Sequence, residues 1–157
     1  MLRLFGDREE ERMSASAARL ATPKGVAMLD GLFNETLLLA HRARAYIAES
    51  APNAVRGEGA AHGEAALGPL VEACELSRLS ARLGFCVAWL LARRAAHEGE
   101  LTAEEAAGPD WRLEGGAVCF DEAAGTLGQL PQALVEMLDQ SRALYLRVAR
   151  LDRRFDS

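Results

Sequence analysis

The sequence predicts an all-α protein folded as an antiparallel three-helix bundle. The first observation is composition: half of the 157 residues are apolar but only 6% are aromatic, and alanine and leucine, which dominate, favour helix over strand. The second is periodicity, because three long stretches repeat apolar residues at helical spacing. The length fits a single domain. We therefore expect one three-helix domain over residues 26–155, preceded by an arm over residues 1–25 that is disordered or forms a short helix.

The first predicted helix begins at Val26 or Leu32 and ends at about Glu49. Pro52 is expected to end it, because proline lacks the amide hydrogen that a helix interior uses. Residues 51–68 contain four glycines and no periodicity, so they are predicted to form a long mobile loop. The positions of this helix that share one face are Leu29, Phe33, Thr36, Ala40, Ala43 and Ile47.

The second predicted helix runs from Pro69 to Glu98 and ends at Gly99, which suits a helix C-cap. Just beyond it, Thr102 and Glu105 have the spacing of a capping box, which predicts a short helix over Ala103–Ala107. Residues 110–128 show no clear pattern. They are expected to form an irregular loop that Trp111 and Phe120 hold against the bundle.

The third predicted helix runs from Leu130 to about Phe155 and has the most regular pattern in the chain. Its apolar residues alternate spacings of four and three, which is typical of a packed helix seam, and only Ser141 interrupts them. The serine hydroxyl is expected to bond the carbonyl four residues earlier on its own helix or a buried partner. The seam consists of Leu130, Leu134, Met137, Ser141, Leu144, Val148, Leu151 and Phe155.

The run Leu83–Ala92 in the second helix has no polar or charged side chain over ten residues. An ordinary surface helix has one polar face, and a membrane span needs about 20 apolar residues. The run is therefore expected to be covered by protein on every side, which predicts a homodimer. Phe85 and Trp89 are the candidate interface residues, although Trp89 fits the core equally well.

The charge and cysteine content limit the possible partners and location. A net charge of −5 and a pI near 5.3 argue against a nucleic-acid partner. No secretion signal is visible in the first 24 residues, which predicts a cytoplasmic protein. Three widely spaced cysteines, Cys74, Cys86 and Cys119, are expected to be small core residues in a reducing compartment.

The residues that carry catalytic or metal chemistry do not cluster in the sequence. His41, His62 and His97 are scattered, and none has a second histidine or cysteine at ligand spacing, so no metal or cofactor is expected. No nucleophile elbow or phosphate loop is present either, which predicts a protein that is not an enzyme. One alternative remains: His41 beside Arg42 and Arg44 has the arrangement of a histidine phosphotransfer module.

Arg78 and Arg82 lie one turn apart just before the apolar run. In one interpretation their aliphatic stems pack inside the bundle and their guanidinium groups pair with carboxylates of the first or third helix. In the other, they form a basic patch that docks an acidic segment of a partner. Both interpretations stay open at this point.

Three segments resemble the alphaproteobacterial RcdA-like family, the regulators of CtrA degradation. The first is Leu32–Ile47, and the last runs from Leu130 to Asp152. The most specific is Leu76–Thr102, in which an Arg-Leu-x-x-Arg-Leu segment leads to Trp-Leu-Leu and then to a Glu-Gly-Glu turn. The resemblance implies a dimeric three-helix bundle without enzymatic activity. It also implies an adaptor for the ClpXP protease that joins a CpdR-like receiver and a PopA-like cyclic-di-GMP effector.

The leading hypothesis is therefore a non-enzymatic adaptor in regulated ClpXP proteolysis of a cell-cycle regulator of the CtrA type. Its mechanism would be tethering, which raises the effective concentration of cargo at the protease. The alternatives are a helical scaffold dimer unrelated to proteolysis and a phosphotransfer module that uses His41.

Overall fold

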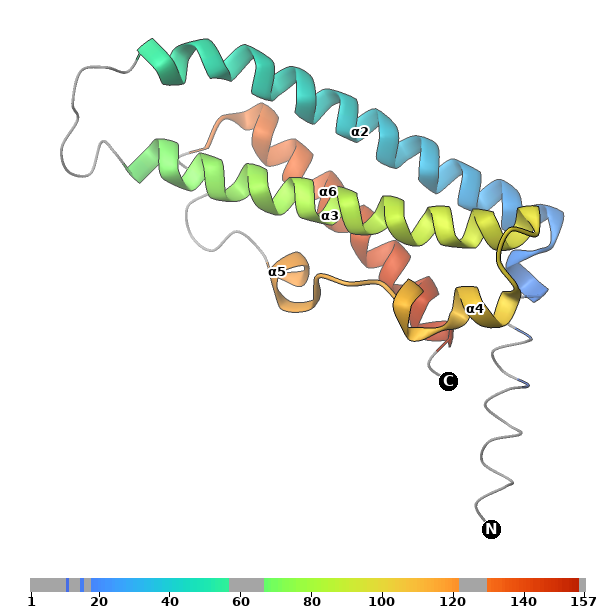
Figure 1. Ribbon diagram of the computed structural model, residues 1–157. Helices are drawn as coiled ribbons and strands as arrows, with labels where there is room; N and C mark the ends of the chain where they lie inside the picture. Colours follow the sequence, from blue (N-terminus) through green and yellow to red (C-terminus); the bar gives the residue numbers. More distant parts are fainter. Residues whose placement is uncertain (1–10, 12–14, 16–17, 57–66, 122–129, 156–157) are drawn as a thin grey trace.

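The computed structural model describes the chain except for residues 1–10, 12–14, 16–17, 57–66, 122–129 and 156–157. The described residues form helices and connecting turns, with no strand among them, so the all-α prediction is confirmed. Three long helices make up the body: α2 (Pro23–Arg56), α3 (Leu67–Glu98) and α6 (Gln132–Asp152). In Figure 1, α2 and α3 lie side by side and α6 lies behind them.

The directions of the three helices differ from the antiparallel arrangement predicted. Helices α2 and α3 are antiparallel, as expected (Figure 1). Helix α6, however, runs in the same sense as α3, because Arg82 contacts Leu138 while Trp89, seven residues later, contacts Asp152. A long connection makes this possible. Residues 99–121 carry the chain back along the body (Figure 1), whereas short loops favour antiparallel neighbours.

The bounds of α2 correct the prediction at both ends. The helix begins at Pro23 and continues past Pro52 to Arg56, so the boundary drawn at residues 25 and 26 falls inside it. Proline removes one amide donor from a helix interior but does not prevent the following residues from keeping helical dihedrals. The predicted loop over residues 51–68 is thus helical at both ends, and its middle, residues 57–66, lies outside the described residues.

The end of α3 and the turn after it match the prediction. Helix α3 ends at Glu98, and Gly99 has a φ of 81°, the left-handed conformation that glycine adopts most easily. Helix α4 (Ala103–Ala107) then begins with both hydrogen bonds of the capping box between Thr102 and Glu105. These features were predictable because each depends on a few neighbouring residues.

The segment after α4 is more regular than expected. It contains a 3-10 turn, η2 (Pro109–Trp111), and a short helix, α5 (Gly116–Phe120); residues 122–129 lie outside the described part. Phe120 does pack on the bundle, since its ring lies edge-to-face with that of Tyr145 on α6, 5.3 Å between centroids, but Trp111 does not anchor the segment as predicted, because its side chain is 41% exposed. The most deeply buried residue of the segment is Cys119, which lies fully in the core.

Helix α6 buries the predicted seam against the other two long helices. Ser141 at the break donates a hydrogen bond to the carbonyl of Leu138, 2.8 Å away. A 3-10 turn, η4 (Arg153–Phe155), follows the helix. Cys86 and Cys119 belong to the core as predicted, but Cys74 is exposed. The buried seam residues are Leu134, Met137, Ser141, Leu144, Val148 and Leu151.

Within the described part of the chain, no helix has both the length and the hydropathy of a membrane span.

Candidate interaction site on α3

The four predicted site residues share one stripe of α3. Arg78, Arg82, Phe85 and Trp89 are spaced by four, three and four residues, which places them on the same side of the helix. This side faces α5 and α6, because the hydrogen bonds of Arg82 and Trp89 lead to these two helices. The stripe of α3 predicted to bind a partner or a second copy therefore contacts other segments of the same chain.

Arg82 lies inside the protein and is only 2% exposed. Its Nε donates to the carbonyl of Cys119 at 2.9 Å, and its Nη2 donates to the carbonyl of Asp121 at 2.6 Å. Nη1 donates to the carbonyl of Leu138 at 3.2 Å and to Oγ of Ser141 at 3.3 Å. In this structure Arg82 does not reach the surface, as the partner-docking interpretation requires, because its guanidinium is surrounded by backbone carbonyls of α5 and α6.

Burial is also the main reason why the pKa of Arg82 is lowered from its ordinary value, with a smaller contribution from the nearby charge of Arg78. Arg78 itself is partly exposed, and its Nη1 lies 3.5 Å from Oε1 of Glu75 one turn earlier on the same helix. The two arginines therefore do not form one basic patch. Arg82 bonds carbonyls inside the protein, and only Arg78 reaches the surface.

Trp89 belongs to the core rather than to a dimer interface. Its side chain is 2% exposed, and its Nε1 donates to Oδ1 of Asp152 at 2.7 Å. The guanidinium of Arg93 lies over the indole, 4.9 Å from the ring centroid, a cation–π geometry. The interface prediction is thus wrong for Trp89, because the residue is enclosed by α6 and by its neighbour on α3.

Phe85 is half-buried and packs against the backbone of Gly115, just before α5. Gly115 has a φ of 99°, and a Cβ atom placed there would lie 2.6 Å from the Phe85 ring and 2.6 Å from the sulfur of Cys119. Glycine is therefore required at this position for two reasons, its backbone conformation and its contact with Phe85. The contact between Gly115 and Phe85 therefore places the start of α5 against α3.

Replacing Gly115 with alanine should separate these two requirements from each other. Gly99 is the matched control, because it also has a positive φ but has open space where a Cβ would stand. Gly99→Ala should cost about 1 kcal/mol for the left-handed backbone alone, and Gly115→Ala at least about 1 kcal/mol more for the clash. Urea denaturation measures both. Equal losses for the two variants would contradict the packing of Phe85 on Gly115.

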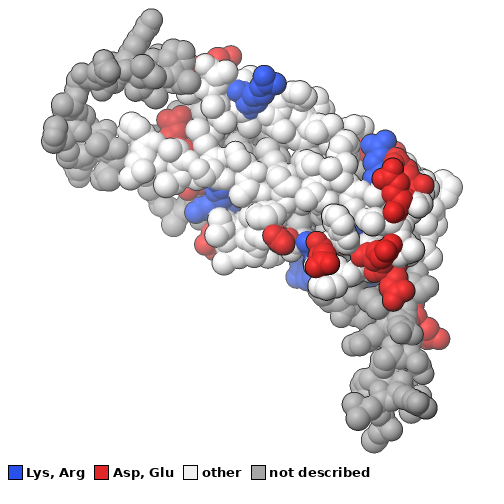
Figure 2. Space-filling view, viewed as in Figure 1, with Lys and Arg blue, Asp and Glu red and all other residues white. Residues whose placement is uncertain are grey.

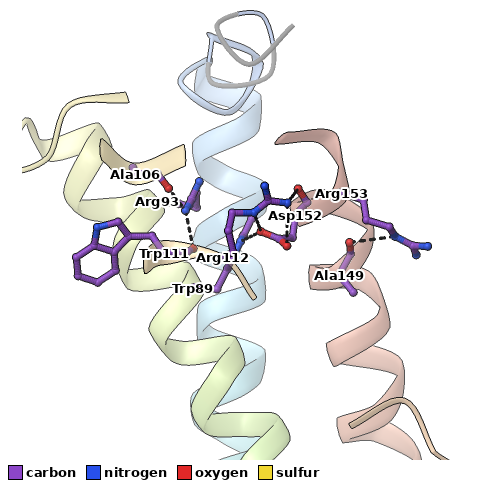
Figure 3. Close-up of polar contacts among 8 residues, drawn as sticks. All are labelled: Trp89, Arg93, Ala106, Trp111, Arg112, Ala149, Asp152 and Arg153. Carbon is purple, nitrogen blue, oxygen red and sulfur yellow. Dashed lines mark hydrogen bonds and ion pairs between the residues drawn. The ribbon is translucent and has the colours of Figure 1, made fainter. Parts of the chain in front are cut away.

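Sequence reasoning missed the polar cluster that fixes the connection between α4 and α5 (Figure 3). Nη2 of Arg93 donates to the carbonyls of Ala106 and, at 2.9 Å, Trp111. Arg112 reaches Asp152 with Nε at 2.9 Å from Oδ1 and Nη2 at 3.2 Å from Oδ2. Burial lowers the pKa of Arg93 to about 10. The only signal in the sequence was Arg93 itself, a charged residue directly after an apolar run.

The apolar run on α3 is not covered on every side. Its exposed residues, Gly84, Ala88 and Leu91, continue a stripe that begins with Ser77 and Ser80. None of the five is charged, and Figure 2 shows few charged side chains over the middle of α3. We call these five residues the α3 ridge. Three of its residues, Gly84, Ala88 and Leu91, are the exposed part of the apolar run that was expected to be covered in a dimer.

Two grooves flank the α3 ridge, each enclosing about 420 Å³. We call the first the α2 groove; it is bounded by α2 and α3 and lined by Ala40, Ala43, Arg44, Ile47, Ser80, Leu83, Gly84 and Val87. We call the second the Trp111 groove; it lies between α3 and the segment around η2 and is lined by Ala81, Gly84, Phe85, Ala88, Trp89, Asp110, Trp111, Arg112 and Glu114.

His41 is exposed on α2. Of its two basic neighbours, Arg42 donates to Oε1 of Gln140 at 2.7 Å, and Arg44 lines the α2 groove. Among the described residues, no three histidine, cysteine, aspartate or glutamate side chains gather where they could hold a metal ion. The expected absence of a cofactor stays a prediction.

Residues 21–157 match the family described as "Protein of unknown function (DUF1465)". Neither the curated proteins nor the solved structures contain a match.

Proposed function

This chain belongs to the DUF1465 family, and from that premise we propose that it is a non-enzymatic adaptor that brings a cell-cycle regulator of the CtrA type to the ClpXP protease. RcdA is itself a DUF1465 member, which agrees with the resemblance of Leu76–Thr102 to the RcdA-like signature. That signature stretch lies on α3 and its C-terminal turn. The observation that carries the proposal is the α3 ridge, an uncharged surface with a groove on each side.

An adaptor needs a rigid body with surfaces for more than one partner, and the structure supports this requirement. The α3 ridge separates two grooves, so two different segments have room to bind at once. The connection between α4 and α5 is held by Arg93 and Tyr145, which bond the carbonyls of Trp111 and Glu114, so one wall of the Trp111 groove is preformed. Binding to preformed surfaces avoids the entropic cost of ordering a loop, and holding two partners together raises their effective concentration.

We further propose that two copies form a dimeric three-helix bundle through the α2 groove. Ser80 and Gly84 line it with small side chains that let two helices approach closely, and Ile47 at its edge is 43% exposed. Exposed apolar surface of this kind marks interaction sites. Phe85, proposed from the sequence as an interface residue, lines the other groove, so Ile47 replaces it in this role.

The dimer predicts that Ile47→Glu is a soluble monomer at micromolar concentration, because a carboxylate from each copy would have to leave water at a mainly apolar interface. Light scattering measures the mass, which should fall from about twice 16.9 kDa to that of one chain. Leu38→Glu is the matched control, since Leu38 is 67% exposed on the same helix and does not line the groove. A wild-type mass of one chain would contradict the dimer.

The adaptor role is tested by retention on immobilised ClpX, with and without a CpdR-like receiver. We expect retention that increases when the receiver is present, and none on bare resin. Absence of retention under both conditions would contradict the role in proteolysis and favour a scaffold dimer.

A second candidate function rests on the exposure of His41 on α2, which leaves its ring accessible to a phosphodonor. Incubation with acetyl phosphate followed by detection of acid-labile phosphate tests it. Phosphate that is absent from His41→Gln would support a phosphotransfer module, whereas no incorporation would exclude it.

A further inference from the structure

The Trp111 groove has a shallow floor of small side chains. Ala81, Gly84 and Ala88 come from successive turns of α3, and the half-buried ring of Phe85 lies beside them. Small residues on a helix leave space for a side chain from elsewhere, and the lining of this groove is mainly apolar. The floor therefore fits one large apolar side chain rather than a polar ligand.

The opposite wall of the groove is held in place by three separate contacts. Nη2 of Arg93 donates to the carbonyl of Trp111 at 2.9 Å, and the hydroxyl of Tyr145 donates to the carbonyl of Glu114 at 2.7 Å. Between them, Arg112 is tied to the carboxylate of Asp152. Buried side chains from α3 and α6 thus fix the backbone of the wall before any partner arrives.

Trp111 is exposed although its backbone is fixed. Its ring points away from the polar cluster (Figure 3), lines the groove and is 41% exposed. A tryptophan held beside an apolar groove without being buried is the kind of residue that contributes most to protein–protein binding. A partner side chain that enters the groove would cover this ring.

The rim of the groove is acidic. Asp110 and Glu114 both line it and are exposed, and within the described part of the chain neither carboxylate has an ion-pair partner. The nearby guanidinium of Arg112 is paired with Asp152. Further exposed acidic residues, Glu100 and Glu104, lie around the start of α4, where Figure 2 shows red side chains gathered.

We propose that the Trp111 groove binds a partner segment that presents one large apolar side chain flanked by lysine or arginine. The apolar side chain would occupy the floor against Phe85 and Trp111, and the flanking cations would approach Asp110 and Glu114. Complementary charge at a rim mainly accelerates and orients binding, while the apolar contact supplies most of the affinity. The inference rests on the proposed adaptor function, because it assigns one of the surfaces through which an adaptor would hold a partner.

The test uses three fluorescein-labelled peptides and the full-length protein. The probe peptide is Lys-Lys-Phe-Leu-Lys-Lys, and its two controls replace the lysines with glutamate or the Phe-Leu pair with two serines. We expect the probe to bind, as measured by anisotropy, and both controls to bind at least about tenfold more weakly. Binding should also shift the tryptophan emission, and Trp111→Phe should remove most of that shift, because Trp111 is 41% exposed whereas Trp89, which also lines the groove, is 2% exposed.

Two variants test the two parts of the site. Asp110→Asn combined with Glu114→Gln should weaken the probe about three- to tenfold, the effect of two exposed ion pairs. Ala88→Leu fills the floor from an exposed position and should weaken it at least tenfold, with an unchanged melting temperature as the sign that the fold is intact. Asp30→Asn combined with Glu49→Gln is the charge-matched control, because these exposed residues lie on α2 and do not line the groove.

Several outcomes would overturn the inference. If the serine peptide binds as tightly as the probe, the peptides are attracted by net charge alone. If the Asp110→Asn, Glu114→Gln variant binds the probe with unchanged affinity, the two rim carboxylates do not contribute to binding. Loss of dimer mass in Ala88→Leu alone would show that a second copy occupies the groove. Retention of the protein on immobilised ClpX is measured separately. Binding of the probe peptide without retention on ClpX would contradict only the adaptor function. Retention on ClpX without binding of the probe peptide would contradict only the proposed role of the Trp111 groove.

Discussion

Replacing Arg82 with methionine is expected to lower the free energy of unfolding by about 3–5 kcal/mol. Methionine fills much of the space of the aliphatic stem but has no donors. The carbonyls of Cys119, Asp121 and Leu138 would then lose the hydrogen bonds that Arg82 donates inside the protein. A buried acceptor left unpaired costs about 1–3 kcal/mol. The measurement is urea denaturation followed by far-UV circular dichroism.

Arg94→Met is the matched control for this variant. Arg94 lies on the same helix, but its side chain is about half exposed and pairs with Glu98 one turn later. Exposed pairs of this kind contribute about 0.3–0.5 kcal/mol, so the control should unfold almost like wild type. If Arg82→Met unfolds like the control, the carbonyl contacts do not hold α5, and Arg82 becomes available again as a partner-binding residue.

The sequence predicted those parts of the fold that depend on neighbouring residues. The end of α3 at Gly99 and the capping box of Thr102 and Glu105 each require only a few positions in a row. The buried face of α6 could also be predicted, because apolar residues at alternating spacings of four and three identify the buried side of a helix whatever that side packs against. The element type and the buried face followed from local pattern.

The direction of α6 relative to α3 was not predictable in this way. A seam shows which side of a helix is buried but not which way the helix runs across its neighbour. The direction depends on the path of the chain after α3, and the described part of that path, residues 99–121, is held by Arg82, Arg93 and Cys119, which contact residues far along the chain. Hydrogen bonds from arginine side chains to distant carbonyls leave no periodic signal in the sequence.

The sequence identified the stripe of α3 that makes contacts, but those contacts are with the same chain and not with a second protein. Arg82 and Trp89 do form the stripe of α3 that binds another segment, and that segment belongs to the same chain. A core and an interface use the same residue types, tryptophan and arginine beside small apolar residues. Trp111, placed by sequence reasoning as an anchor, is instead the exposed aromatic residue of a groove.

The polar cluster around Asp152 gives the second large expected effect. Asp152 is 8% exposed and accepts hydrogen bonds from Trp89 and Arg112 with its carboxylate. Asp152→Ala removes the negative charge opposite Arg112 and the acceptor for the indole, which should cost about 3–5 kcal/mol. Asp152→Asn keeps an acceptor oxygen of the same size and should cost about 1–2 kcal/mol. Asp139→Ala, at an exposed position of the same helix, is the control and should change stability by no more than about 0.5 kcal/mol.

A double-mutant cycle then shows whether Asp152 acts through Arg112. If the ion pair ties η2 to the end of α6, combining Asp152→Ala with Arg112→Met should cost less than the sum of the two single changes, by about 1–3 kcal/mol. The pair also holds the wall of the Trp111 groove, so both single variants should weaken the lysine probe peptide although neither changes the acidic rim. Strictly additive losses, together with unchanged peptide binding, would contradict this coupling, because the wall of the groove would then be held without the contact between Arg112 and Asp152.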